Sequence, residues 1–106
     1  MQAMRAVVSM RRLRAERQLF EVHARLAVAR AEAEVVAGQS AQLQEAAEEA
    51  RIRMLVAETA LAHRAWDEAR GHAEAMAASL VAARCLVAQL EAAQDEVFDE
   101  LLSWGP

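Results

Sequence analysis

Small and apolar residues recur along the first third of the chain at alternating steps of three and four positions. These residues are Leu19, Val22, Leu26, Ala29, Ala33 and Val36. This is the spacing of a coiled-coil seam, in which one face of a helix packs against another helix. Towards the N-terminus the seam weakens, because Arg12 falls where an apolar side chain should lie. The pattern predicts a first helix over residues 2–36 whose first turns are only partly packed.

Residues 37–40 carry the signals of a turn between two helices. Gly38 can adopt the left-handed backbone conformation that ends a helix, and Ser40 is a good N-cap for the helix that follows. Because the connection would be short, the flanking helices should lie antiparallel. We therefore expect a turn at 37–40.

A second seam follows the expected turn and changes phase part-way. Its first part consists of Leu43, Ala47, Ala50, Met54, Ala57 and Leu61. In strict heptads this part would continue into Arg64 and Glu68. The apolar residues of the second part are instead shifted, and they are Ala69, Ala73, Met76, Leu80, Ala83, Val87, Leu90, Val97, Leu101 and Trp104. Such a phase change can unwind a supercoil without ending the helix, so the pattern predicts a second helix over residues 41–103 with a phase slip at 64–73.

Gly71 lies inside this slip and leaves two all-α architectures open. If the helix continues, the chain is a single helical domain over 1–106, a long antiparallel two-helix coiled-coil hairpin. If Gly71 ends the helix, three helices form an up-down-up bundle. The hairpin is favoured, because neither Arg70 nor His72 is a proper N-cap and an interior glycine costs only about 1 kcal/mol. The hairpin would leave an uncovered apolar strip beyond residue 75, which is typical of a protein-binding surface.

The composition agrees with long helices. Alanine accounts for 27 of the 106 residues, and the only proline is the last residue. Because alanine buries little area, we expect a thin helix seam and no thick core. No uninterrupted apolar run approaches the roughly 20 residues that cross a bilayer, and the first residues lack a secretory signal pattern. We therefore expect a cytoplasmic protein without an integral membrane segment. Its single cysteine, Cys85, is expected to be a small buried helix residue.

Charged residues are distributed unevenly along the chain. Residues 1–17 carry five arginines and one acid, whereas residues 89–106 carry five acids and no basic residue. Each cluster opposes the macrodipole of its own helix, since the N-terminal end of a helix favours anions and the C-terminal end favours cations. The compensation could be an antiparallel hairpin that brings the ends together, or an external partner for each end. Since the net charge is −4, no nucleic-acid partner is expected.

The residues that support catalysis do not form the required patterns. His63 and His72 point to opposite sides of one helix, and neighbouring carboxylates such as Glu48 and Glu49 do not converge on one point. Phosphate-binding glycine loops and nucleophile motifs are absent from the sequence. We predict that the protein is not an enzyme and has no catalytic residues, no metal ligands and no cofactor.

The segment 10–35 places basic positions ahead of an Ala/Glu/Arg/Leu repeat, and it reads MRRLRAERQLFEVHARLAVARAEAEV. An arginine-rich start followed by an alanine-rich antiparallel hairpin resembles the central-stalk proteins of type III secretion and flagellar export, the YscO/HrpO-like and FliJ-like families. The resemblance implies a cytoplasmic stalk that inserts into the hexameric export ATPase, links it to the export gate and can escort chaperones. The chain departs from these families in its shortness and in its expected early turn.

The expected function is therefore a non-catalytic coiled-coil stalk or scaffold of a type III secretion export apparatus. Its basic segment would face acidic surface on a partner such as the export ATPase, and its apolar C-terminal segment would anchor the other end. The expected partner-binding residues are Arg11, Arg12, Arg14, Arg17, Phe98, Leu101, Leu102 and Trp104. A second copy of the chain is another candidate partner. The alternatives are a self-assembling or surface-coating protein similar to phasins, and a small helical adaptor.

Overall fold

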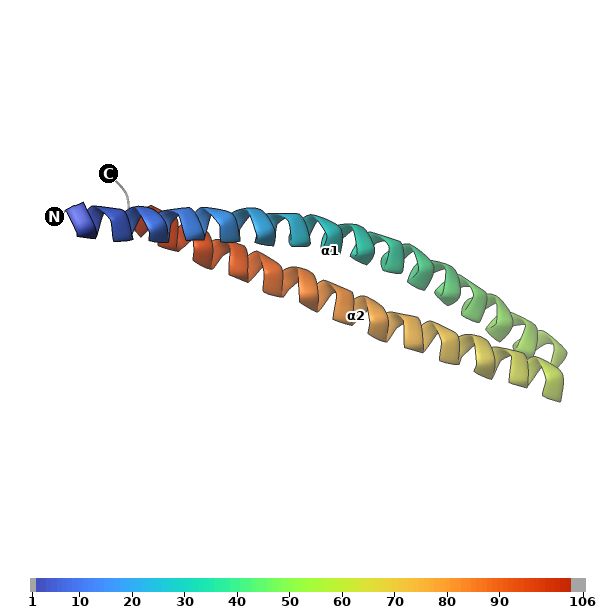
Figure 1. Cartoon of the computed structure of the whole chain (residues 1–106). Coiled ribbons are helices and arrows are strands. Elements are labelled where there is room, and N and C mark those ends of the chain that lie inside the picture. The colour runs from blue at the N-terminus through green and yellow to red at the C-terminus, as the bar shows by residue number, and fades with distance from the viewer. Residues whose placement is uncertain (1, 104–106) are drawn as a thin grey trace. The chain divides into compact units, whose positions relative to one another are not determined.

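Two long helices joined by a two-residue turn make up the part of the chain that the structure describes (Figure 1). The computed structural model describes residues 2–103, in which helix α1 spans Gln2–Ala57 and helix α2 spans Ala60–Ser103. No strand occurs among these residues. The predicted all-α antiparallel two-helix hairpin is thus confirmed. Helix α2 continues through Gly71 without a break, so the three-helix alternative is wrong.

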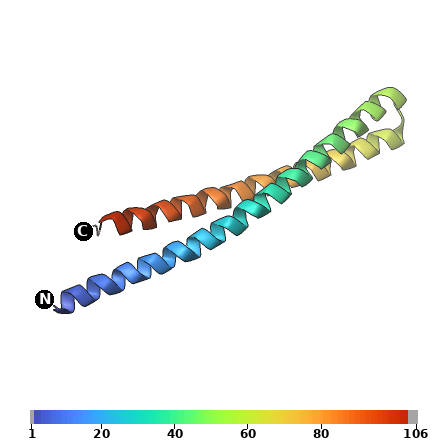
Figure 2. The same ribbon diagram turned by 90° about the horizontal axis from the view of Figure 1, so that it is seen from above.

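The chain divides into two compact units, each of which is an antiparallel pair of helix segments. The terminal pair contains Met1–Arg30 and Leu86–Pro106, and the turn pair contains Ala31–Cys85. Figure 2 shows the turn pair closed by the connection between the green end of α1 and the yellow start of α2. The terminal pair thus joins the first part of α1 to the last part of α2.

The turn lies at Glu58 and Thr59, so the turn predicted at 37–40 is wrong. Glu58 has a φ of 50°, and its N–H donates to the carbonyl oxygen of Met54 at 2.9 Å. This left-handed residue therefore ends α1 by the single hydrogen bond of an αL cap. Thr59 begins α2 as an N-cap, because its hydroxyl accepts a hydrogen bond from the backbone N–H of Ala62 at 3.1 Å.

Gly38 and Ser40 lie inside α1 and do not form a turn. No glycine in the described chain has a positive φ, so Gly38 keeps helical geometry. Ser40 is only 2% exposed, and its hydroxyl accepts a weak hydrogen bond of 3.4 Å from Gln44. Ser40 takes the position between Val36 and Leu43 that continues the heptad spacing. A turn there would interrupt the seam on both sides. The packing lost would cost more than the roughly 1 kcal/mol of one glycine inside a helix.

The seam runs without a break from Ala15 to Met54 in α1 and from Ala62 to Leu101 in α2, and all of its members are buried or half-buried. In α1 they are Ala15, Leu19, Val22, Leu26, Ala29, Ala33, Val36, Ser40, Leu43, Ala47, Ala50 and Met54. In α2 they are Ala62, Trp66, Ala69, Ala73, Met76, Leu80, Ala83, Val87, Leu90, Gln94, Val97 and Leu101. The phase slip predicted at 64–73 is therefore wrong. The phase changes between Met54 and Ala62 because the chain turns there.

The two seams are in register about Glu58, so that members equidistant from this residue face each other. In the terminal pair, Leu26, Ala29 and Leu90 form a buried cluster against which Val87 packs. Leu26 and Leu90 are equally far from Glu58 along the chain, and so are Ala29 and Val87. The seam of α2 beyond residue 75 is thus covered by α1, and the uncovered strip predicted there is wrong for these positions.

We predict that replacing the left-handed Glu58 changes stability according to the side chain introduced. Glu58→Gly should raise the free energy of unfolding by about 0.5–1 kcal/mol, because glycine adopts this conformation without a steric penalty. Glu58→Ala keeps a β-carbon and should bring no such gain. Urea unfolding at one fixed protein concentration measures both variants, and an equal effect of Gly and Ala would argue against the left-handed cap.

We predict that the Leu26 cluster is an energetic centre of the terminal pair. Leu26→Ala should lower the free energy of unfolding by about 2–4 kcal/mol, since it removes buried methyl groups and leaves a cavity. The matched control is Val28→Ala, because Val28 is 58% exposed on the same helix and its loss should change stability by only about 0.5 kcal/mol. Similar losses in the two variants, measured by urea unfolding, would show that the seam is not packed as described.

Candidate functional site

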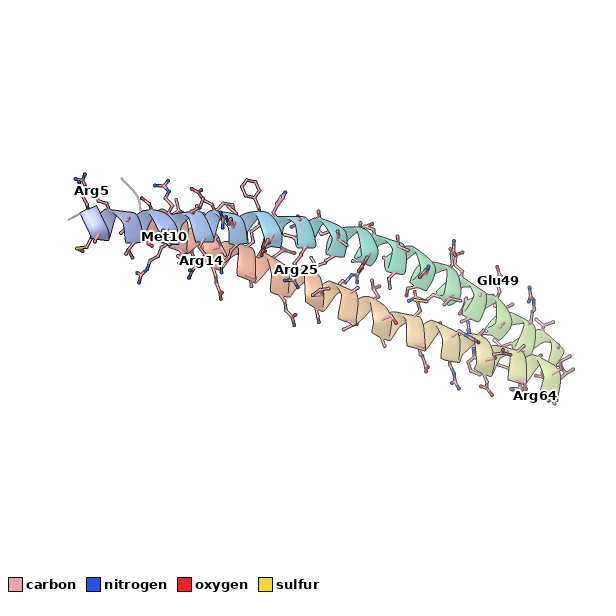
Figure 3. All side chains as sticks on the ribbon, viewed as in Figure 1. Arg5, Met10, Arg14, Arg25, Glu49 and Arg64 are labelled. Atoms are coloured by element: carbon pink, nitrogen blue, oxygen red, sulfur yellow. The ribbon has the colours of Figure 1, made fainter. Side chains whose placement is uncertain are left out.

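The predicted basic segment lies on the first part of α1 in the terminal pair. Its arginines Arg11, Arg12, Arg14 and Arg17 are all exposed, and Figure 3 shows Arg14 extending from α1. Arg12 forms a 3.5 Å ion pair with Glu16 on the same helix, and exposed pairs of this kind are weak. In the described chain, no carboxylate lies within ion-pair distance of the other three guanidinium groups, which leaves them available to another molecule.

The predicted apolar C-terminal residues are divided by the structure. Phe98 is 44% exposed and Leu102 is 75% exposed, so both are accessible. Leu101 is half-buried, because it belongs to the seam and faces Ala15. Trp104 lies outside the described residues. The accessible apolar surface at this end of α2 therefore consists of Phe98 and Leu102.

The structure places the basic and apolar segments in the same helix pair, whereas the sequence analysis assigned them to opposite ends of the molecule. The side chains of His23 and Gln94 are 3.4 Å apart, and Arg30 and Glu91 form an ion pair of 4.0 Å. These contacts join α1 to α2 within the terminal pair. The expectation of two separate ends is wrong because the turn at Glu58 lies near the middle of the chain.

The terminal pair keeps its two charge clusters mostly unneutralised. Arg30–Glu91 is the ion pair that joins the two helices there, and no arginine pairs with Asp95 or Asp99 within residues 2–103. A groove of about 390 Å³ between the helices adds to the acidic character. It is lined by Gln18, Glu21, Val22, Arg25, Ala93, Glu96, Val97 and Glu100. The outer surface of α1 is therefore basic near its start, and that of α2 is acidic near its end.

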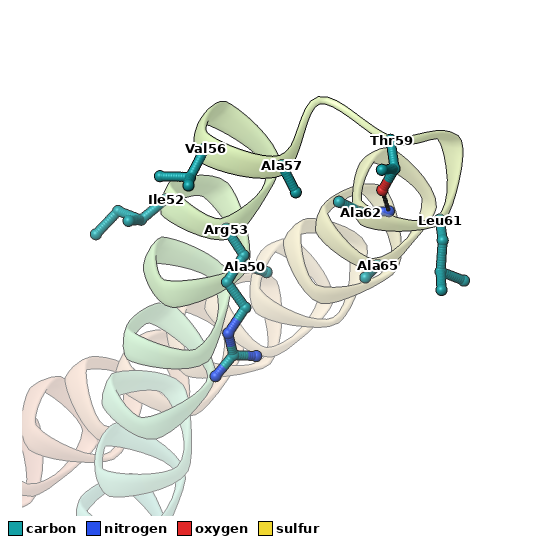
Figure 4. A pocket seen from close by; sticks show the side chains of 9 residues that line it. All are labelled: Ala50, Ile52, Arg53, Val56, Ala57, Thr59, Leu61, Ala62 and Ala65. Atoms are coloured by element: carbon teal, nitrogen blue, oxygen red, sulfur yellow. Dashed lines mark hydrogen bonds between the residues drawn. The ribbon is translucent and has the colours of Figure 1, made fainter.

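A second candidate surface, which the sequence analysis missed, lies beside the turn. It is an apolar groove of about 480 Å³ (Figure 4). It is lined by Ala50, Ile52, Arg53, Val56, Ala57, Thr59, Leu61, Ala62 and Ala65. Val56 is 82% exposed and Leu61 is 74% exposed. Val56 and Leu61 lie off the seam on either side of the turn, so the sequence could have grouped them only if the turn had been placed correctly.

Charged side chains near this groove are paired within their own helices. The Arg51 guanidinium donates to both carboxylate oxygens of Glu48, at 3.0 and 2.8 Å. These hydrogen bonds lower the pKa of the Glu48 carboxyl and raise the pKa of Arg51. The Arg70 guanidinium lies 5.0 Å from the centre of the Trp66 ring, a cation–π contact. The groove itself is lined by apolar side chains, Thr59 and one arginine, Arg53, which pairs with Glu49 at 3.9 Å.

Helix α2 is also long and apolar enough to span a membrane by length and composition alone. It contains an 18-residue window of mean hydropathy 1.4, of which 11% is buried. The expectation concerned uninterrupted apolar runs, and the apolar part of α2 is interrupted by Ser79, Arg84 and Gln89. The stretch owes its hydropathy to leucine and valine more than to alanine, and Arg84 lies within its apolar part. The seam residues Val87 and Leu90 of the same stretch pack on α1.

The described residues contain no group of three His, Cys, Asp or Glu side chains that could hold a metal ion. Cys85 is exposed, which corrects the expectation of a buried cysteine.

Comparison of the chain with protein-family models, with curated proteins and with solved structures finds no match. The function is therefore inferred from the surfaces of the terminal pair and of the turn.

We predict that the groove beside the turn binds apolar molecules. The double variant Val56→Gln and Leu61→Gln should lower the fluorescence of the dye anilinonaphthalene sulfonate by about half, because this dye reports accessible apolar surface. The control Val35→Gln removes a valine that is 60% exposed away from the groove, and it should change the signal little. Equal losses in both proteins would contradict a defined groove.

Proposed function

We propose that the protein is a non-catalytic coiled-coil stalk or scaffold that acts through helix-mediated contacts with other proteins. The observation that carries this proposal is the accessible and unneutralised surface of the terminal pair. There, three exposed arginines have no carboxylate partner in the described chain, and Phe98 and Leu102 are accessible in the same unit. Arginine and aromatic side chains are the types that contribute most of the binding energy at protein interfaces.

A more specific form of the proposal places the protein in a type III secretion export apparatus in the cytoplasm. Its support is the resemblance of segment 10–35 to the export central-stalk families. One stated departure from those families is removed, since the turn lies near the middle of the chain and the two helices have 56 and 44 residues. The partners would be the export ATPase, the export gate or chaperones.

In this role the basic segment of α1 contacts acidic surface on the partner. Arg11, Arg14 and Arg17 supply charges that have no carboxylate partner in the described chain, while Phe98 and Leu102 supply apolar contact area. Because both sets lie in one helix pair, a single partner can engage them together. This differs from a stalk that holds one partner at each end.

A surface-coating function is the second candidate, and the exposed apolar stretch of α2 favours it. In such a coat the outer side of α2 would lie on a lipid or polymer surface. Full insertion of α2 would be costly, because the seam with α1 would be lost and Arg84 would cost about 2.5–3.5 kcal/mol in the hydrocarbon centre. Lipid vesicles should therefore bind the protein without any protein partner if it is a coat.

We predict that reversing the basic segment abolishes capture of a purified hexameric export ATPase from the same organism. The variant Arg11→Glu, Arg12→Glu and Arg14→Glu should lose pull-down by about tenfold or more, since attraction becomes repulsion at three positions. Its helicity, measured by circular dichroism, should remain.

The matched control reverses Arg53, Arg64 and Arg70 in the turn pair, which changes the net charge equally. This control should retain capture. If the first variant still captures the ATPase, or if the wild type never does, the export role is refuted. Vesicle binding by the wild type alone would favour the coat.

A further inference from the structure

One side of the terminal pair carries exposed large apolar residues on both helices. His23 and Gln94 contact each other across the pair and mark this side. Phe20 lies one helical turn before His23, and Phe98 lies one turn after Gln94, so both flank the same contact. Leu13 lies one heptad before Phe20 on α1, and Leu102 lies one turn after Phe98 on α2, so both extend the same surface. The apolar side is defined here as Leu13, Phe20, Phe98 and Leu102.

The apolar side exposes large side chains, and the chain as a whole exposes more area than a compact protein of its mass. Phe20 is 75% exposed and Leu13 is 49% exposed, and large aromatic side chains on a soluble surface commonly mark an interface. The chain exposes 8123 Å², whereas a folded monomer of 11.6 kDa exposes about 5,800 Å². The excess of about 2,300 Å² exceeds the roughly 800 Å² that each partner buries in a standard interface.

Charge indicates which molecule covers the apolar side. Arg17 lies beside Leu13 and Phe20 on the surface of α1, at spacings of four and three residues. Asp99 lies beside Leu102 on α2 in the same way. Arg17 and Asp99 are equally far from Glu58, and neither has an ion-pair partner within the described chain. On this side α1 therefore presents a basic residue beside apolar ones, and α2 presents an acidic residue beside apolar ones. A second copy of the pair can match both, because its α2 can lie against α1 and its α1 against α2.

We propose that the apolar side binds a second copy of this chain in a twofold-symmetric dimer. In this dimer, α1 of each terminal pair lies antiparallel to α2 of the other copy. Phe20 and Leu13 then pack against Phe98 and Leu102 across the interface, and Arg17 lies level with Asp99 of the second copy. Each contact occurs twice, as twofold symmetry requires. The four helix segments form a bundle whose new core is the apolar side.

The same charges exclude the reversed arrangement. If the second copy were turned end for end, Arg17 would lie near Arg17 of the other α1, and Asp99 would lie near Asp99 of the other α2. Like charges facing each other destabilise an interface and suppress that mode of binding. The dimer also compensates part of each charge cluster, because Arg17 at the start of α1 approaches Asp99 at the end of the other α2.

This inference goes beyond the proposed function and does not rest on it, because a dimer can form in a scaffold or in a coat. The dimer takes up Arg17, Phe98 and Leu102, so a further protein partner would contact the dimer through Arg11 and Arg14. Sedimentation equilibrium of the full chain at about 50 µM tests it, a concentration at which an interface of standard size associates. The wild type should sediment at twice the monomer mass. The double variant Phe20→Gln and Phe98→Gln should be monomeric and still helical, while the control Val28→Gln should remain dimeric. A monomeric wild type would overturn the proposal, as would equal behaviour of the variant and the control.

A charge exchange tests the orientation. Arg17→Glu and Asp99→Arg should each weaken dimerisation by about tenfold, because each places two like-charge pairs in the interface. An equimolar mixture of the two single variants should dimerise as strongly as the wild type, since each α1 then meets an oppositely charged α2. The double variant in one chain should dimerise equally well. If the mixture stays as weak as its components, α1 does not lie beside α2 of the second copy, and the proposed dimer is wrong.

Discussion

The heptad seam that folds back on itself at Glu58 is the constraint on which the rest of the structure depends. A two-helix layer has no third element to bury a mismatched face, so each helix is stabilised only where its seam meets the other. Isolated helices gain little from propensity alone, and packing of the apolar stripe supplies most of their stability. Continuity of the seam therefore decides where the chain turns. It also explains why Ser40 and Gln94 are accepted at seam positions.

The composition of the seam determines how much surface remains exposed. Alanine occupies many of its positions, among them the buried Ala15, Ala29, Ala50 and Ala73. Alanine lets helices lie close together but removes little apolar area from water. The larger apolar side chains are consequently divided between the seam and the outer faces. A helix pair built in this way keeps accessible apolar surface, which is useful for a protein that works by binding others.

The charge clusters follow from the same fold. Folding about Glu58 places the arginine-rich start of α1 and the acidic end of α2 in one helix pair, yet the contacts between the helices are seam contacts with few ion pairs. The arginines and acids lie on outward positions where the opposite helix does not reach them. These charges therefore act on molecules outside the pair more than on the opposite helix. This gives the terminal pair one basic and one acidic outer surface, while the region beside the turn is mainly apolar.

The amino-acid pattern by itself determined the class of the fold and nearly all of the seam positions. Heptad spacing and alanine content are local properties, and they predicted two antiparallel helices and the packing faces of Leu26 and Leu90. The predicted break at Gly38 and Ser40 was wrong because strong local signals there are overridden by the seam that continues through them. The phase change near Leu61 was a real signal of the turn, but it was interpreted as a slip inside one helix.

Only the tertiary structure decided where the chain turns, and with it which surfaces stay exposed. The turn consists of Glu58, which has a left-handed backbone conformation, and Thr59, which caps α2. It contains no glycine or proline, the residues by which a turn is usually recognised in a sequence. The location of the turn sets the pairing of every seam residue and brings the two charged ends into one unit. It also leaves Phe20, Phe98 and the groove beside the turn accessible. These features depend on contacts between residues far apart in the chain, which spacing along one helix does not specify.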